Sequence, residues 1–78
     1  MNTGEMIKEI RIKSLLNQFE FARELEVSFS TVNRWENNKC ILNYKALKKI
    51  KLFCIQKNIT FNLENMIISE IKHLREDQ

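Results

Sequence analysis

The chain has 78 residues, a net charge of +3 and an apolar fraction of 44%. This length suits a single domain over 1–78, and the apolar content suits a packed core rather than a disordered chain. No apolar run approaches the ~18 residues of a membrane span and the N-terminus has no signal-peptide pattern, so we expect a cytoplasmic protein.

The positive charge is concentrated in the middle of the chain. Residues 37–63 contain six lysines and no acidic residue, whereas residues 1–36 and 64–78 are slightly acidic. A lysine block is often only a solvated helix surface, and it favours nucleic acid only together with other features. Two cysteines, Cys40 and Cys54, and one histidine are too few for a zinc site of about four ligands. We therefore expect reduced thiols, no metal and no cofactor.

Apolar residues at helical spacing predict an all-α, compact bundle of about five helices. The first helix is predicted over about 4–15, with Thr3 as N-cap. The second is predicted over about 18–25, where Asn17 is the cap and Glu20 completes a capping box. Because the chain has no proline and its only glycine is Gly4, we expect the helices to end at polar side chains.

Three further helices follow. One is predicted over about 29–36 after the cap candidate Ser28, one from after Asn43 to about 56, and one over about 62–75. The fourth helix has one buried stripe and leaves Leu52 and Ile55 outside it, so apolar surface remains on that helix. Only residues 26–28 separate the second and third helices, and two short helices joined in this way form a helix-turn-helix.

From Arg11 to about Lys39 the chain resembles the Cro and phage-repressor type of helix-turn-helix, also called the xenobiotic-response-element-like regulators. The matching stretches are Asn17-Gln18-Phe19-Glu20-Phe21-Ala22, Val27-Ser28, Ser30-Thr31-Val32 and Trp35-Glu36-Asn37-Asn38-Lys39. The resemblance implies a lambda-repressor-like fold over about two-thirds of the chain, and it does not account for the last helix.

The chain departs from this family at two turn positions. The family usually has glycine where this chain has Glu26 and Asn38, and both places typically need a left-handed backbone. Asparagine adopts that conformation readily. Glutamate costs about 1–2 kcal/mol there, unless the turn is reshaped, so we expect lost stability rather than a lost fold.

The resemblance implies that the exposed start of the third helix meets base edges in the major groove. Those residues are Phe29, Ser30 and Arg34, with Thr31 or Asn33 in support. Arg34 suits guanine, with a phosphate contact or a surface ion pair as the alternative. Phe29 suits a thymine methyl group, with core packing as the alternative.

A second set of residues resembles contacts to the DNA backbone: Asn17, Gln18, Asn37, Lys39 and Lys45. Gln18 begins a helix, where free N–H groups favour a phosphate. The alternative for Asn17 is a cap alone, and for Asn37 a helix stop alone. Such contacts position a protein on DNA without reading its sequence.

Two more residues have an architectural role by the same resemblance. Arg11 and Glu36 are expected to form an ion pair between the first and third helices, because either charge alone would be costly when partly buried. Trp35, beside Glu36, is expected in the core rather than as a platform for a base.

The sequence therefore predicts a regulator that binds double-stranded DNA as a homodimer. A repressor is favoured because so small a protein has little surface for recruiting polymerase, and a bacterial or phage source is favoured by the resemblance. The alternative is an antitoxin-like or adaptor protein that grips a protein partner through residues 62–75. An enzyme is disfavoured, because no nucleophile set, phosphate loop or paired carboxylates can be assembled.

Overall fold

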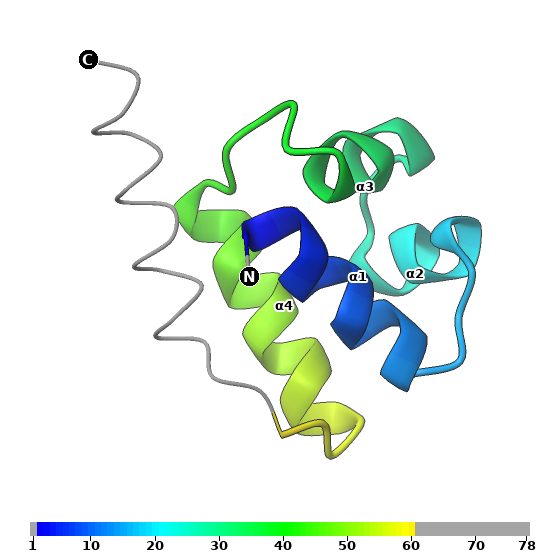
Figure 1. The fold of residues 1–78 in the computed structure, drawn as a ribbon. Coiled ribbons are helices and arrows are strands. Elements are labelled where there is room, and N and C mark those ends of the chain that lie inside the picture. Colours follow the sequence, from blue (N-terminus) through cyan, green and yellow to red (C-terminus); the bar gives the residue numbers. More distant parts are fainter. Residues whose placement is uncertain (1, 61–78) are drawn as a thin grey trace.

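The computed structural model describes residues 2–60, which form four helices (Figure 1). Their bounds are Thr3–Lys13 for α1, Gln18–Leu25 for α2, Phe29–Glu36 for α3 and Tyr44–Gln56 for α4. The predicted all-α class is confirmed, and the predicted bounds of α2, α3 and α4 agree with those observed. The helix predicted over 62–75 lies outside the described residues.

Each helix begins at an asparagine or serine whose side chain accepts a hydrogen bond from the backbone N–H three residues later. These caps are Asn2, Asn17, Ser28 and Asn43. The capping box of Asn17 and Glu20 is present as predicted. The prediction of Thr3 as the first cap is wrong, because Asn2 Oδ1 accepts from the Glu5 N–H at 2.9 Å and Thr3 is already helical and buried. Asparagine and serine are among the strongest N-caps, so the helix starts are encoded locally.

The four helix ends share one backbone motif. In each case a residue with positive φ follows the helix: Leu15 (59°), Glu26 (58°), Asn38 (57°) and Asn58 (55°). The next N–H then donates to the carbonyl five positions earlier, as Val27 does to Ala22 at 2.9 Å, which is the Schellman arrangement. Glycine is the usual residue at this position, and this chain uses none.

The expectation of polar helix ends holds for α1 too, whose C-cap is Ser14, but α1 ends at Lys13 rather than near residue 15, and the left-handed residue beyond it is the apolar Leu15. The reason is the residue that follows. Leu16 packs against the core, as do Val27 after α2 and Ile59 after α4. An apolar residue just beyond the turn is a regular partner of the Schellman motif. Burial of Leu16 therefore turns the chain at Leu15, whose own side chain is left exposed.

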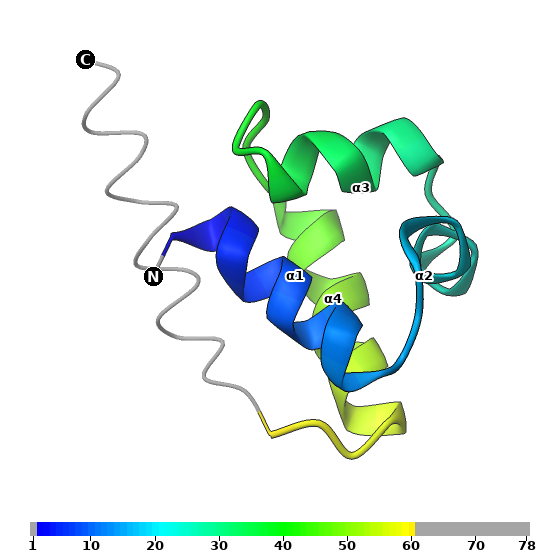
Figure 2. The same ribbon diagram turned by 45° about the vertical axis from the view of Figure 1, so that its right-hand side comes forward.

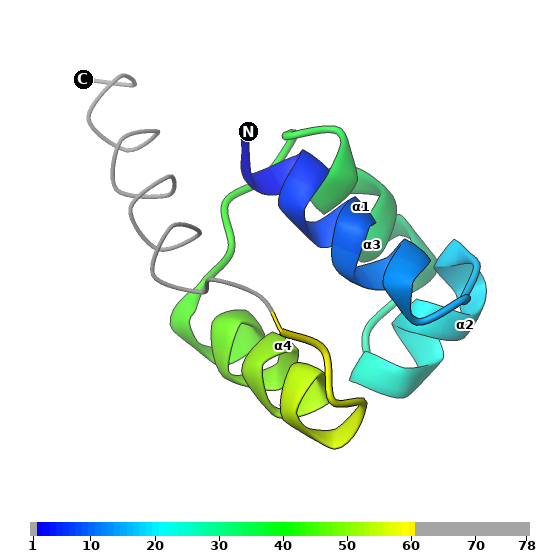
Figure 3. The same cartoon turned by 60° about the horizontal axis from the view of Figure 1, so that its bottom comes forward.

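The core lies where α1, α2, α3 and α4 meet. Its fully buried large side chains are Ile7, Ile10, Phe21, Val32 and Ile50. Phe21 of α2 meets Phe53 of α4 edge to face, with ring centroids 5.1 Å apart. Figure 2 shows α3 lying across α1, with α2 nearly end-on, and Figure 3 shows α4 beside the group formed by the other three helices. This packing holds α3 from behind and leaves its opposite side in solvent.

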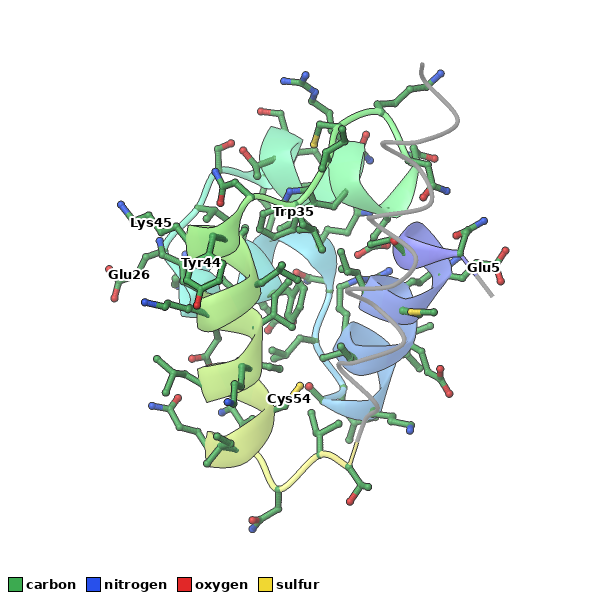
Figure 4. The ribbon with its side chains drawn as sticks, turned by 90° about the vertical axis from the view of Figure 1, so that its left-hand side faces the viewer. Glu5, Glu26, Trp35, Tyr44, Lys45 and Cys54 are labelled. Carbon is green, nitrogen blue, oxygen red and sulfur yellow. The ribbon has the colours of Figure 1, made fainter. Side chains whose placement is uncertain are left out.

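Trp35 belongs to this core, as predicted. It is 5% exposed, and Figure 4 shows it pointing from α3 toward α4. Cys54 is also buried, whereas Cys40 is half-buried, and both are free thiols. Burial raises the pKa of the Cys54 thiol above its ordinary value. On α4, Leu52 and Ile55 are exposed, as the apolar pattern predicted.

Within residues 2–60, every helix is too short or too polar to cross a bilayer.

Candidate nucleic-acid interface

The turn between α2 and α3 keeps the left-handed backbone that the family resemblance implies. Glu26 lies at φ 58° and ψ 43°, and its N–H donates to the Arg23 carbonyl at 3.1 Å. Lys49 of α4 donates to the Glu26 carbonyl at 3.3 Å. The turn is therefore not reshaped, and the cost of about 1–2 kcal/mol for a side chain in this region applies.

The start of α3 is fixed by its cap. Ser28 Oγ accepts from the Thr31 N–H at 3.1 Å and lies 2.7 Å from Thr31 Oγ1. Thr31 is half-buried and lines a shallow depression together with Val27 and Trp35. Its hydroxyl thus serves the cap, on the side of α3 that faces α4.

The opposite side of α3 is open to solvent. We call it the outer face, and it carries the exposed side chains of Phe29, Ser30 and Arg34. Ser30 and Arg34 are four residues apart and so lie on one side of the helix. In the part of the chain that the structure describes, the Arg34 side chain makes no hydrogen bond or ion pair. A charged guanidinium held on a fixed helix with its donors unused suits a bidentate acceptor such as guanine.

Behind this face, α3 is tied to α1 by an ion pair. Arg11 Nε donates to Glu36 Oε2 at 2.7 Å, and Arg11 Nη2 donates to Glu36 Oε1 at 3.0 Å. The two side chains are only 14% and 5% exposed. Arg11 Nη1 also donates to the Leu16 carbonyl at 3.0 Å. The pair that the resemblance implied is thus present, bidentate and largely shielded from water.

The same carboxylate anchors α2. Gln18 Nε2 donates to Glu36 Oε1 at 3.2 Å, and Gln18 Oε1 accepts from Asn33 Nδ2 at 3.3 Å. Asn37 Nδ2 in turn donates to the Asn33 carbonyl at 2.8 Å. We call Arg11, Gln18, Asn33, Glu36 and Asn37 the anchoring network. It unites residues that the sequence assigned to base reading, to phosphate binding and to architecture.

The end of α3 meets the start of α1 at very short range. Gly4 N–H donates to Asn38 Oδ1 at 3.0 Å, which satisfies one of the free donors at the start of α1. A Cβ on Gly4 would lie 2.5 Å from the Glu36 carbonyl oxygen. Glycine permits this close approach, whereas any side chain would require α1 and α3 to move apart. No local sequence pattern singles out Gly4 for this role.

The remaining backbone-contact candidates are dispersed. Asn17 lies at the start of α2, where its side chain and backbone N–H both engage Glu20. Lys39 is exposed just after α3, and Lys45 is exposed in the first turn of α4, at the rim of the depression that Thr31 lines. Figure 4 shows Lys45 extending away from the helices. The three residues thus belong to three different parts of the fold: the start of α2, the loop after α3 and the first turn of α4.

Sequence reasoning missed a second aromatic residue beside the outer face. Phe19 of α2 stacks on Phe29 of α3, with ring centroids 4.2 Å apart and planes 12° from parallel. Both rings remain partly in solvent, so the alternative of core packing for Phe29 does not describe its environment. One clue was available: Phe19 lies off the buried stripe of its helix, as Phe29 does.

The arrangement offers no metal centre among residues 2–60, where no three His, Cys, Asp or Glu side chains are grouped to hold an ion. What it offers is a rigidly held helix with an exposed polar and aromatic face.

A helix-turn-helix family model of the Cro and phage-repressor type matches residues 7–51. The match contains α2, the turn and α3 whole, together with most of α1 and the first half of α4. No curated protein and no solved structure matches the chain at a significant level. Since residues 7–51 are more than half of the sequence, the chain belongs to the xenobiotic-response-element family of helix-turn-helix DNA-binding regulators.

Proposed function

We propose that this protein is a sequence-specific transcriptional repressor that binds an inverted-repeat operator as a homodimer, with α3 in the major groove. One observation carries the proposal: the outer face of α3 is exposed while its inner face is locked by the anchoring network. A major groove admits one helix, and a helix held at a fixed angle delivers the same side chains to the same base pairs each time.

In this proposal the bases are read by Phe29, Ser30 and Arg34. Arg34 donates to guanine O6 and N7, and Ser30 hydrogen-bonds to a neighbouring base edge. Thr31 and Asn33 support the reading indirectly, because Thr31 fixes the helix start and Asn33 belongs to the anchoring network. The readers and their supports thus differ in exposure.

Phosphate contacts come from Asn17, Gln18, Asn37, Lys39 and Lys45. Asn17 and Gln18 lie at the start of α2, where backbone N–H groups favour an anion. Lys39 and Lys45 are exposed cations on either side of the loop between α3 and α4. These contacts add affinity for any duplex and make it depend on salt.

The dimer would place two half-sites about 10–10.5 base pairs apart. The exposed Leu52 and Ile55 of α4 support an interface there, since exposed apolar side chains on one helix suit a partner surface. The same observation favours a second candidate, an antitoxin-like or adaptor protein that uses α4 and residues 62–75 to bind another protein. Residues 62–75 lie outside the described part of the chain.

The test is a binding selection on randomised duplex DNA at near-physiological salt. We expect a short inverted repeat, and light scattering on the complex should give two protein chains per duplex. The dimer interface is tested by the double variant Leu52→Asp with Ile55→Asp. It should weaken binding to the full repeat far more than binding to one half-site. Salt-sensitive binding with no recovered sequence would instead favour the protein-binding candidate.

A further inference from the structure

The stacked pair of Phe19 and Phe29 is an unusual surface feature. Phe19 is 66% exposed and Phe29 38%, although phenylalanine is normally among the most buried residues. The rings come from different helices and lie nearly parallel at a centroid distance of 4.2 Å. Neither ring belongs to the hydrophobic core of the described chain.

The pair stands at the edge of the proposed reading surface. Phe29 is the first residue of α3 and Phe19 the second residue of α2. In Figures 1 and 2 the first turns of α2 and α3 lie on the same side of the molecule. Ser30 follows Phe29 directly, and Gln18 precedes Phe19. An apolar patch therefore adjoins polar side chains on the face that we assign to DNA.

The chemistry of the groove limits what such a patch can recognise. A phenyl ring neither donates nor accepts a conventional hydrogen bond, so it cannot use the polar edges of the bases. The only apolar group that a standard base presents in the major groove is the C5-methyl group of thymine.

We propose that Phe19 and Phe29 act as one apolar reading element for a thymine methyl group. This inference rests on the function proposed above. Phe29 contacts the methyl group, and Phe19 is a positioning residue that stacks on one side of the Phe29 ring. A ring held before binding loses less conformational freedom when the complex forms, which favours binding. A lone Phe29 at the exposed start of a helix would lack this support.

The test measures Kd for the selected operator with each thymine replaced in turn by uracil, which removes only the methyl group. For the unsubstituted protein we expect about fourfold weaker binding when uracil replaces one particular thymine in either half-site, the loss that follows from one buried methyl group. In Phe29→Ala and in Phe19→Ala the uracil-to-thymine Kd ratio should fall to about one. Because each ratio compares two DNAs with the same protein, loss of protein stability affects both and cancels.

Two control variants sharpen the result. Tyr44→Ala removes an exposed aromatic ring on α4 and should leave the ratio unchanged. Phe19→Tyr retains the stacking ring and should restore the ratio that Phe19→Ala loses. In addition, a 5-methylcytosine·guanine pair at the sensitive position should bind better than a cytosine·guanine pair.

The outcomes separate the two proposals. An operator in which every uracil is tolerated overturns the methyl-reading role while the operator-binding function stands, and is the result expected if the pair contacts another protein. A ratio lost in Phe29→Ala but kept in Phe19→Ala overturns the positioning role of Phe19. If no operator is recovered at all, the proposed function fails and this inference fails with it.

Discussion

The two sides of α3 differ in how many partners their side chains have. On the inner side, Glu36 alone accepts three hydrogen bonds, two from Arg11 and one from Gln18. On the outer side, Arg34 has none within the described residues, and Phe29 has a single ring partner. Side chains of α3 that are bonded to α1 and α2 set the orientation of the helix, and outer-face side chains without such bonds are available to the bases. The exposure and the hydrogen bonds of a side chain together indicate whether it orients α3 or is available to DNA. The residue type alone does not distinguish these two roles.

The largest expected effect on stability comes from removing the ion pair on the inner side of α3. Glu36→Gln removes the charge opposite Arg11, and an uncompensated, largely buried guanidinium should lower the free energy of unfolding by about 3–5 kcal/mol. Denaturant melts measure the change. The matched control is Glu24→Gln, whose partner Lys57 lies 3.3 Å away on the surface, where an ion pair is worth about 0–1 kcal/mol. Equal losses in the two variants would contradict the inner side's structural role.

On the outer side, Arg34→Ala should leave stability almost unchanged and weaken operator binding by about 1–3 kcal/mol, with base preference relaxed at one position. Lys39→Ala should weaken binding to all duplexes alike and lower the slope of log K against log salt by about one unit. Repeating the selection and titrating salt with both variants checks this. Identical behaviour of the two would remove the distinction between base readers and phosphate contacts.

The contact of α1 with the end of α3 gives a third, smaller effect. Gly4→Ala adds a methyl group within 3 Å of the Glu36 backbone, and such overpacking costs about 1–3 kcal/mol. Alanine gains about 1 kcal/mol of helix propensity over glycine, so a net loss of up to about 2 kcal/mol is expected. Lys8→Ala, an exposed position of the same helix, is the control for helix propensity in thermal melts. A stabilised Gly4→Ala protein would show that α1 can shift away without cost.

The smallest effect is a gain, at the turn that joins the two helices. Glu26→Gly should raise the free energy of unfolding by about 1 kcal/mol, because glycine adopts positive φ without the Cβ clash. Asn58→Gly is the comparison and should gain less, since asparagine already tolerates this region. Base preference should stay unchanged in both, because neither touches the outer face. A destabilised Glu26→Gly would mean that the glutamate side chain contributes more than its backbone costs.

Much of the fold could be predicted from sequence because its determinants are local. A helix start can be recognised within three residues of its N-cap, as at Asn17, Ser28 and Asn43. The apolar stripe of Phe21, Ala22 and Leu25 likewise identifies the buried side of α2. Asn2 was overlooked only because Thr3 beside it is also a good cap. The end of α1 was missed because it depends on the burial of Leu16, a tertiary contact.

The candidate site was less predictable, since side-chain partners come from other helices. The sequence position of Gln18 and Asn33 predicts contacts with DNA, yet the two side chains are hydrogen-bonded to each other. The stacking of Phe19 on Phe29 and the role of Gly4 depend on distances between elements far apart in the chain, which no local pattern specifies. The Arg11–Glu36 pair came from the family resemblance, not from spacing.

The strained helix ends also bear on how the chain folds. The cost of a glutamate in the left-handed region exists only once the turn has formed, so it divides between the folding and unfolding rates according to when that happens. If the turn after α2 is already closed in the transition state, Glu26→Gly speeds folding; if it closes later, the same change slows unfolding instead. Leu15, Asn38 and Asn58 mark the other three helix ends in the same way. Glycine substitutions at these four helix ends, with folding and unfolding rates measured for each, would therefore report the order in which the ends form.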